Sequence, residues 1–121
     1  MLNMLRLRQI ADYSGNPELA PEVPISGREA FQRYIDHTML FLTGSGGELL
    51  LLGDGGKFFI GPADEHWDVV MLVKQRSIES FFAFASNTEY LAGVGHRTAA
   101  VLDSRLLPIV ECKNYNITTC N

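Results

Sequence analysis

The chain has 121 residues, of which 46% are hydrophobic and 20% are charged, as in an ordinary single globular domain. Its formal net charge of −4 at pH 7 argues against a nucleic-acid partner, because binding to phosphates requires a basic face. Arg6 and Arg8 interrupt the apolar start of the chain, and no later run reaches the length of a membrane span, so we expect no membrane partner. These features predict a cytoplasmic protein in which Cys112 and Cys120 stay reduced.

The first part of the chain predicts a strand, a long loop and a helix. Residues 4–10 alternate apolar side chains with arginines, which is typical of a half-buried strand. Residues 11–25 contain three prolines at a spacing that predicts a surface loop. Ser26 and Glu29 stand at capping-box spacing, and apolar residues follow at helical intervals until Gly44, so we expect a helix here.

The second part predicts strands on both sides of a further helical region. Two apolar stretches, 48–60 and 67–73, are rich in strand-forming residues. Ser77 is an expected N-cap, and the helical pattern that follows it continues through Val101. Residues 104–111 form the last predicted strand, which its proline limits to a sparsely bonded place in the sheet.

The order of these elements predicts an α+β fold, the βαββαβ sandwich of ferredoxin-like proteins, with the helices on one face of an antiparallel sheet. Residues 1–110 form this single domain, with a long loop at 11–25, and residues 111–121 form a polar C-terminal tail. The runs at 48–52 and 68–73 are apolar at adjacent positions, so both faces of the sheet need cover. We therefore expect a homodimer through the sheet face that the helices leave open.

The glycines at positions 53, 55 and 56 do not match a nucleotide-binding loop. A phosphate-binding loop continues from Gly-Lys into Ser or Thr and then a helix, whereas Phe58 and a strand follow Lys57. Glycine and aspartate tolerate positive φ, so this segment turns a hairpin or bends one long strand. We prefer the bend, with the strand continuing to Ile60.

Over residues 28–110 the chain resembles the dimeric α/β-barrel superfamily, and within it a large uncharacterised family of short ferredoxin-like proteins. The resemblance rests on four segments, namely the bent strand at 48–61, the strand at 65–73 with Trp67-Asp68, the helix at 77–93 and the ending at 96–110. It implies two sheets that pack face to face across a two-fold axis, forming a dimeric α/β barrel. The superfamily includes cofactor-independent monooxygenases, lactone isomerases and haem-degrading enzymes, and the smaller family implies no particular reaction.

Histidine, arginine and aromatic side chains are the candidate site residues. His66 or His96 is the candidate catalytic base, and the candidate ligand-binding residues are Tyr34, His37, Trp67, Arg97 and Arg105. We expect the site between the first helix, the turn at 65–67 and the segment around His96-Arg97, under the loop at 11–25. No two of the three histidines form a short-spaced ligand pair, so we expect no metal and no other cofactor.

Two functions, and one structural alternative, remain open from the sequence. The first function is that of a cofactor-independent small-molecule enzyme, of the monooxygenase or isomerase kind. The second is that of a non-catalytic dimer that binds another protein or a small organic or anionic ligand. In the alternative interpretation, the polar and aromatic residues only pack and pair within the fold.

Overall fold

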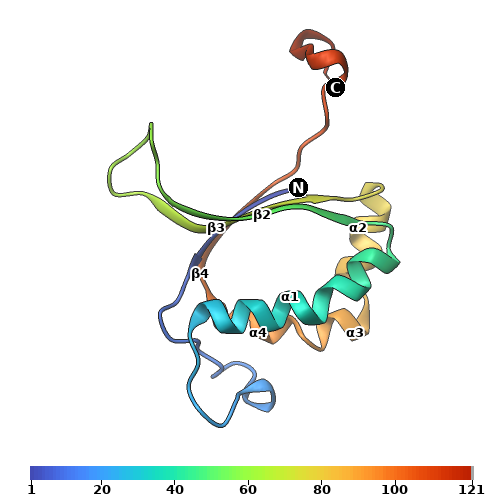
Figure 1. Ribbon diagram of the computed structural model, residues 1–121. Helices are drawn as coiled ribbons and strands as arrows, with labels where there is room; N and C mark the ends of the chain where they lie inside the picture. The colour runs from blue at the N-terminus through green and yellow to red at the C-terminus, as the bar shows by residue number, and fades with distance from the viewer. Residues whose placement is uncertain (121) are drawn as a thin grey trace.

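Four strands form one antiparallel sheet, and the helices lie on one side of it (Figure 1). The computed structural model describes residues 1–120. The strands are β1 (Leu2–Leu7), β2 (Glu48–Lys57), β3 (His66–Lys74) and β4 (Val101–Leu107), in the sheet order β2-β3-β1-β4. The helices are α1 (Gly27–Gly44), α2 (Ile78–Ala85), α3 (Thr88–Leu91) and α4 (Val94–Ala100). These elements confirm the predicted α+β class and the antiparallel sheet.

The two predicted N-caps are present, and each starts its helix. Ser26 accepts a hydrogen bond from the amide of Glu29 at the start of α1, and Ser77 accepts one from the amide of Ser80 at the start of α2. A side-chain acceptor at these positions satisfies an amide that has no partner within the helix.

The second helical region is divided into three short helices rather than continuing to Val101. Asn87 caps α3 through its side chain, and Gly93 precedes α4. A Cβ at Gly93 would collide with the ring of His37, so the break before α4 lies directly against α1. Val101 pairs with Leu7 and begins β4, which ends before Pro108. The prediction of a strand at 104–111 therefore placed both ends of the strand too late in the sequence.

The glycine segment runs inside β2, so the bent-strand interpretation is correct and the chain does not reverse direction at these glycines. A Cβ at Gly55 would collide with the carbonyl oxygen of Trp67, and Gly56 has a φ of 149°. Glycine is therefore required here for the close approach of β2 to β3. The strand ends at Lys57, earlier than the predicted end at Ile60.

The core lies between one face of the sheet and the helices α1 and α4. Its buried members are Leu5, Tyr13, Ala30, Phe31, Val69, Met71, Ala99 and Ala100. Leu5 is completely buried on the central strand β1, where it pairs with Val69 of β3 and Ser104 of β4. The small residues of α4 let this helix pack closely against α1.

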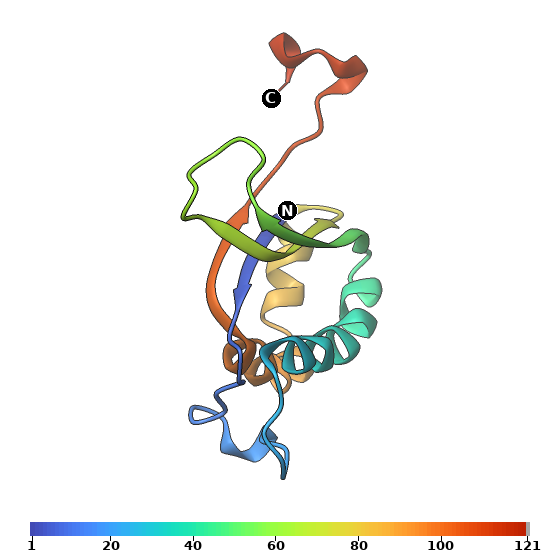
Figure 2. The same ribbon diagram turned by 60° about the vertical axis from the view of Figure 1, so that its left-hand side comes forward.

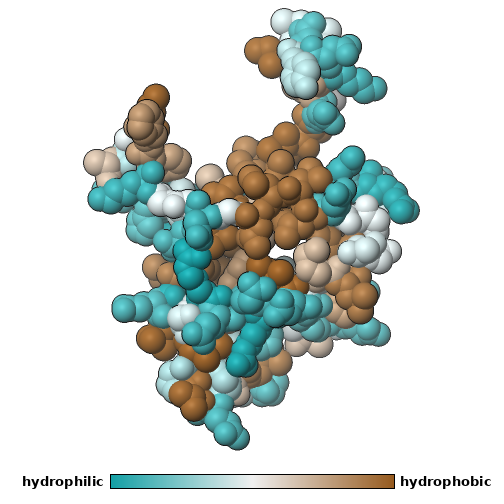
Figure 3. All heavy atoms as spheres, viewed as in Figure 1, coloured by the Kyte–Doolittle hydropathy of each residue, from teal (hydrophilic) through white to brown (hydrophobic). Residues whose placement is uncertain are grey.

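The opposite face of the sheet carries no helix, and it is apolar apart from charged residues of β1 and β4 such as Arg105. Residues opposite one another in an antiparallel pair point to the same face, and Met4 pairs with Val70 while Leu2 pairs with Leu72 and Leu107. Leu51 lies opposite Leu72 and is 55% exposed. Figure 3 shows the apolar surface between the β2–β3 loop and the C-terminal tail.

The loop at 11–25 is irregular apart from one turn of 3-10 helix, η1 (Pro17–Leu19). The C-terminal tail contains two more such turns, η2 (Lys113–Tyr115) and η3 (Ile117–Thr119), and it extends away from the domain (Figure 2). Cys112 and Cys120 form a disulfide within it, so the expectation that both stay reduced is wrong for this structure. Within residues 1–120, every helix is too short or too polar to span a membrane.

Candidate functional site

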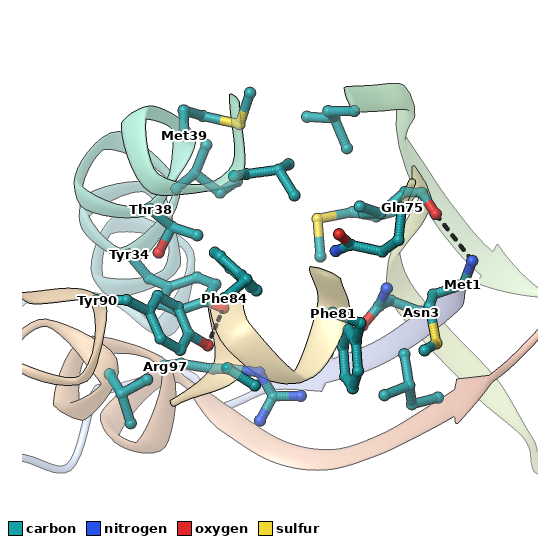
Figure 4. A pocket seen from close by; sticks show the side chains of 18 of the residues that line it. Met1, Asn3, Tyr34, Thr38, Met39, Gln75, Phe81, Phe84, Tyr90 and Arg97 are labelled. Atoms are coloured by element: carbon teal, nitrogen blue, oxygen red, sulfur yellow. Dashed lines mark hydrogen bonds between the residues drawn. The ribbon is translucent and has the colours of Figure 1, made fainter. Parts of the chain in front are cut away.

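A cavity of about 410 Å³ lies between the helices and the sheet, and aliphatic and aromatic side chains form most of its wall (Figure 4). Helix α1 contributes Tyr34, Thr38 and Met39, and α2 contributes Phe81 and Phe84. The floor comes from the sheet and the segment after β3, including Asn3, Met71 and Gln75, and α3 and α4 close the wall with Tyr90 and Arg97. A concave apolar site with a few polar groups is the usual form of a small-molecule site.

Two tyrosines meet at the wall of the cavity. The hydroxyl groups of Tyr34 and Tyr90 are 2.8 Å apart and share a hydrogen bond (Figure 4). Burial raises the pKa of Tyr90 far above its usual value, and the Tyr34 hydroxyl adds to this shift. The Tyr90 phenol is therefore a neutral hydrogen-bonding group rather than a base at physiological pH.

Arg97 brings a positive charge to the same wall. It is half-buried, and its charge acts on Tyr90 in the direction that lowers the phenol pKa. Within residues 1–120, no carboxylate forms an ion pair with Arg97. The guanidinium therefore remains available to an anionic group of a ligand.

Two further polar atoms in the lining have no hydrogen-bond partner. They are Oγ1 of Thr38, a residue that is only 7% exposed, and Oε1 of Gln75. An unsatisfied buried polar group costs about 1–3 kcal/mol, so such atoms are rare in folded proteins. Their presence in a cavity wall favours a ligand that supplies the missing partners.

His37 is close to the cavity but not part of its lining. Its Nε2 donates to the backbone carbonyl oxygens of Glu89 at 2.9 Å and Tyr90 at 3.2 Å, and its ring lies against Gly93. These contacts tie α1 to α3 and so hold Tyr90 in place opposite Tyr34. The sequence proposed a ligand-binding role for His37, whereas its contacts are those of a positioning residue.

His96 lies under the proline-rich loop, as the sequence suggested. Its Nδ1 is 2.8 Å from the hydroxyl of Tyr13, a buried residue of that loop. Burial lowers the pKa of His96, and the charges of Arg33 and His37 lower it further. A Cβ on the neighbouring Gly95 would collide with Asn16 and Leu19, so the loop packs tightly against α4.

Trp67 and Arg105 belong to a different cluster, at the sheet. The guanidinium carbons of Arg6 and Arg105 lie 5.5 Å and 5.1 Å from the centre of the Trp67 ring, which is a cation–π arrangement. Asp103 bridges both arginines, and hydrogen bonds from Arg6 and then Arg105 lower its pKa to about 2. His66 stands near Asp68 with a separation of 3.9 Å.

The structure therefore divides the proposed site residues into three groups. It brings Tyr34 and Arg97 into one cavity with His37 close by, and it places His96 under the loop. It leaves Trp67 and Arg105 in the cluster at the sheet, with His66 on the same strand as Trp67. Sequence reasoning missed Tyr90, Thr38 and Gln75. In the sequence, Tyr90 and Thr38 only continue the helical spacing of apolar residues, and nothing around Gln75 marks it as a cavity residue. No group of three or more histidine, cysteine or acidic residues that could hold a metal occurs within residues 1–120.

Two solved structures closely resemble this chain. A crystal structure of methylated RPA0582 protein shares 32% sequence identity, covers 95% of this chain and 81% of its own, and has a TM-score of 0.83. The chain belongs to the RPA0582 family. A second crystal structure, of RPA0582 from Rhodopseudomonas palustris, shares 33% identity with a TM-score of 0.76 and covers 91% of this chain and 81% of its own. That structure is described as a structural genomics target of unknown function, so the RPA0582 family implies a fold and no reaction. No family model and no curated protein matches the sequence.

Proposed function

We propose that this protein binds a small, mainly apolar organic molecule in the cavity between its helices and its sheet. The observation that carries the proposal is a cavity of about 410 Å³ in which the buried Oγ1 of Thr38 and Oε1 of Gln75 have no partner. Ligand sites in proteins commonly have volumes of roughly 300–1,000 Å³ and apolar walls with a few polar groups. A bound molecule would cover the apolar wall and supply hydrogen bonds to the two free atoms.

Binding without catalysis is the better-supported form of this proposal. Among the described residues, the cavity lining contains no histidine, lysine, cysteine, aspartate or glutamate, so it offers no ordinary general base. His66 and His96, the candidates from the sequence, are not lining residues. Phe81 lines the cavity, whereas Phe58 and Phe82 are 43% and 62% exposed and lie outside the lining, so these three aromatic side chains do not fill it.

A cavity-filling substitution tests the proposal. Ala85 lines the cavity, whereas Ala83, on the same helix, is exposed and lies outside the lining, so Ala85→Phe and Ala83→Phe form a matched pair. Thermal unfolding would be followed with 1-octanol and with octanoate as probes. A ligand at 100 times its Kd stabilises the folded state by about 2.7 kcal/mol. We expect stabilisation of the native protein and of Ala83→Phe, and none of Ala85→Phe. The proposal is contradicted if the probes stabilise both variants equally. It is also contradicted if they stabilise none of the three proteins.

A cofactor-independent enzyme of the monooxygenase or isomerase kind is the second candidate. The observation that favours it is the hydroxyl pair of Tyr34 and Tyr90 beside Arg97, since such donors stabilise a developing oxyanion. A substrate in this cavity would have to supply or recruit its own base. Turnover of a bound compound, detected by mass spectrometry and lost in Tyr90→Phe while binding persists, would raise this candidate above the first.

We propose in addition that the protein is a homodimer through the open face of the sheet, as in dimeric α/β-barrel proteins. The strand order β2-β3-β1-β4 and the helices on one face support a ferredoxin-like arrangement. The apolar residues Leu51, Val70, Leu72 and Leu107 support a partner on the open face. A cytoplasmic location is also a proposal. The disulfide between Cys112 and Cys120 argues against this location, because cytoplasmic thiols are kept reduced. Thiol titration after rapid alkylation of cells would show whether the disulfide is present there.

A further inference from the structure

We infer that the cavity selects a monocarboxylic acid with an apolar body, and that Arg97 binds the carboxylate. This inference rests on the proposed function, because it assigns the class of ligand to the same cavity. It goes further in naming the residue that recognises the ligand and the charge that the ligand carries.

The charges of the lining favour an anion. Within residues 1–120, Arg97 is the only arginine or lysine in the lining, and no acidic side chain lines the cavity. The guanidinium has no ion-pair partner among the described residues, although it is half-buried. A planar guanidinium matches the two oxygens of a carboxylate, and charge-assisted hydrogen bonds of this kind are stronger than neutral ones.

The tyrosine pair adds a neutral donor beside this charge. Two hydroxyl groups that share one hydrogen bond use only one of their two protons, so either Tyr34 or Tyr90 keeps an O–H proton for another acceptor. Arg97 and both tyrosines belong to the same cavity wall (Figure 4). One oxygen of a carboxylate can accept from this hydroxyl while the guanidinium binds the group.

The opening of the cavity is compatible with a charged group at this place. The three exposed residues of the lining, Leu91, Thr98 and Leu106, come from α3, α4 and β4, so the cavity opens beside the helix that carries Arg97. A carboxylate there stays partly hydrated, which limits the cost of removing its charge from water. The apolar body then lies deeper, against Met71 and the aromatic rings of α2.

The charge count separates a carboxylate from a phosphate. A single guanidinium balances one negative charge, whereas a phosphate monoester carries close to two at neutral pH. The other cation of the lining, the ammonium group of Met1, already donates to the carbonyl oxygen of Val73. A dianion beside Arg97 would therefore leave one charge without a guanidinium partner among apolar residues, and such a charge is costly. The lining therefore fits a monoanion.

Isothermal titration with three probes of equal chain length tests the inference. The probes are octanoate, 1-octanol and octyl phosphate, each titrated into the purified full-length protein at pH 7. We expect octanoate to bind about tenfold more tightly than either of the others, as one charge-assisted hydrogen bond is worth this factor. Arg97→Gln should remove the preference for octanoate over octanol.

Arg33→Gln is the matched control, since Arg33 is exposed on α1 and outside the lining, and it should keep the preference. Arg97→Lys retains the positive charge without the planar guanidinium group, so it should keep part of the preference. It replaces Arg97→Gln in the test if that variant does not fold. Equal affinity for octanoate and octanol, or a preference that survives Arg97→Gln, overturns the inference while the proposed function stands. Tightest binding of octyl phosphate overturns the choice of a monoanion. If none of the three probes binds, the inference and the proposed function fail together.

Discussion

The hydroxyl groups of Tyr34 and Tyr90 lie 2.8 Å apart and join α1 to α3 at the wall of the cavity. Tyr90 is buried, while Tyr34 is half-buried, so the two ends of this hydrogen bond are not equivalent. Removing one partner leaves the other hydroxyl in a different environment. The pair therefore allows a sharp test of what the wall contributes to stability.

Tyr34→Phe should destabilise the fold mainly because it leaves the Tyr90 hydroxyl without a partner, and less because one hydrogen bond is lost. The buried hydroxyl of Tyr90 would lose its partner, at a cost of about 1–3 kcal/mol. Tyr34→Phe combined with Tyr90→Phe should cost less than the sum of the single changes, because the double variant leaves no unsatisfied hydroxyl. Urea unfolding of the four proteins measures this. Additive costs would contradict the prediction.

The stability of the fold should rise with pH around the ordinary pKa of histidine. The pKa of His96 is lowered in the folded state, so the unfolded chain binds a proton more readily than the folded one. This contribution to stability is present above pH 6.5 and is lost as the pH falls through the lower pKa of the folded state. The melting temperature, measured between pH 5 and pH 8 in native protein and in His96→Gln, should show a slope that the substitution reduces. His66→Gln, at an exposed position, is the control. An unchanged slope in His96→Gln refutes the assignment.

Gly95→Ala should loosen the proline-rich loop. The added methyl group would collide with Asn16 and Leu19, and forcing extra volume into a packed contact costs about 1–3 kcal/mol. Gly15→Ala, in the same loop, meets no atom within 4 Å and should have almost no effect. Limited proteolysis of residues 11–25 together with thermal unfolding compares the two. Equal protease resistance would show that the loop does not depend on this contact.

Val70→Asp should separate the proposed dimer, because a charge on the open face of the sheet would be buried without a partner. Leu40→Asp is the control, since Leu40 is 75% exposed on α1. Sedimentation at micromolar concentration measures the oligomeric state, and circular dichroism shows whether the separated chain stays folded. A monomeric native protein would end this proposal.

The sequence was sufficient for the features that depend on local chemistry. The caps at Ser26 and Ser77 and the long helix α1 follow from side chains and amides within one turn. The division at Gly93 could not be predicted in the same way, because it depends on the ring of His37 from another helix. The end of the last helix at Ala100 depends on distant residues in the same way. Val101 leaves the helix because it pairs with Leu7 of β1, and the sequence around Val101 does not show this pairing.

The candidate site was predictable only in part. Arg97 and Tyr34 stood out by residue type and by their helical positions, and they line the same cavity. Thr38 and Gln75 are ordinary residues in the sequence, and only the absence of partners in three dimensions distinguishes them. Trp67 was grouped with the histidines by proximity in the chain. Its cation–π contacts instead place it with Arg6 and Arg105.

The position of β1 between β3 and β4 affects the order in which the chain can fold. The first strand obtains its two neighbours only from the second half of the sequence, and the bond between Arg6 and Asp103 spans 97 residues. Contacts between distant residues slow folding, since the intervening chain must lose its freedom before they form. During synthesis, the apolar strands β1 and β2 therefore remain unpaired until their partner strands have been made. The nascent chain is most exposed to aggregation during this interval.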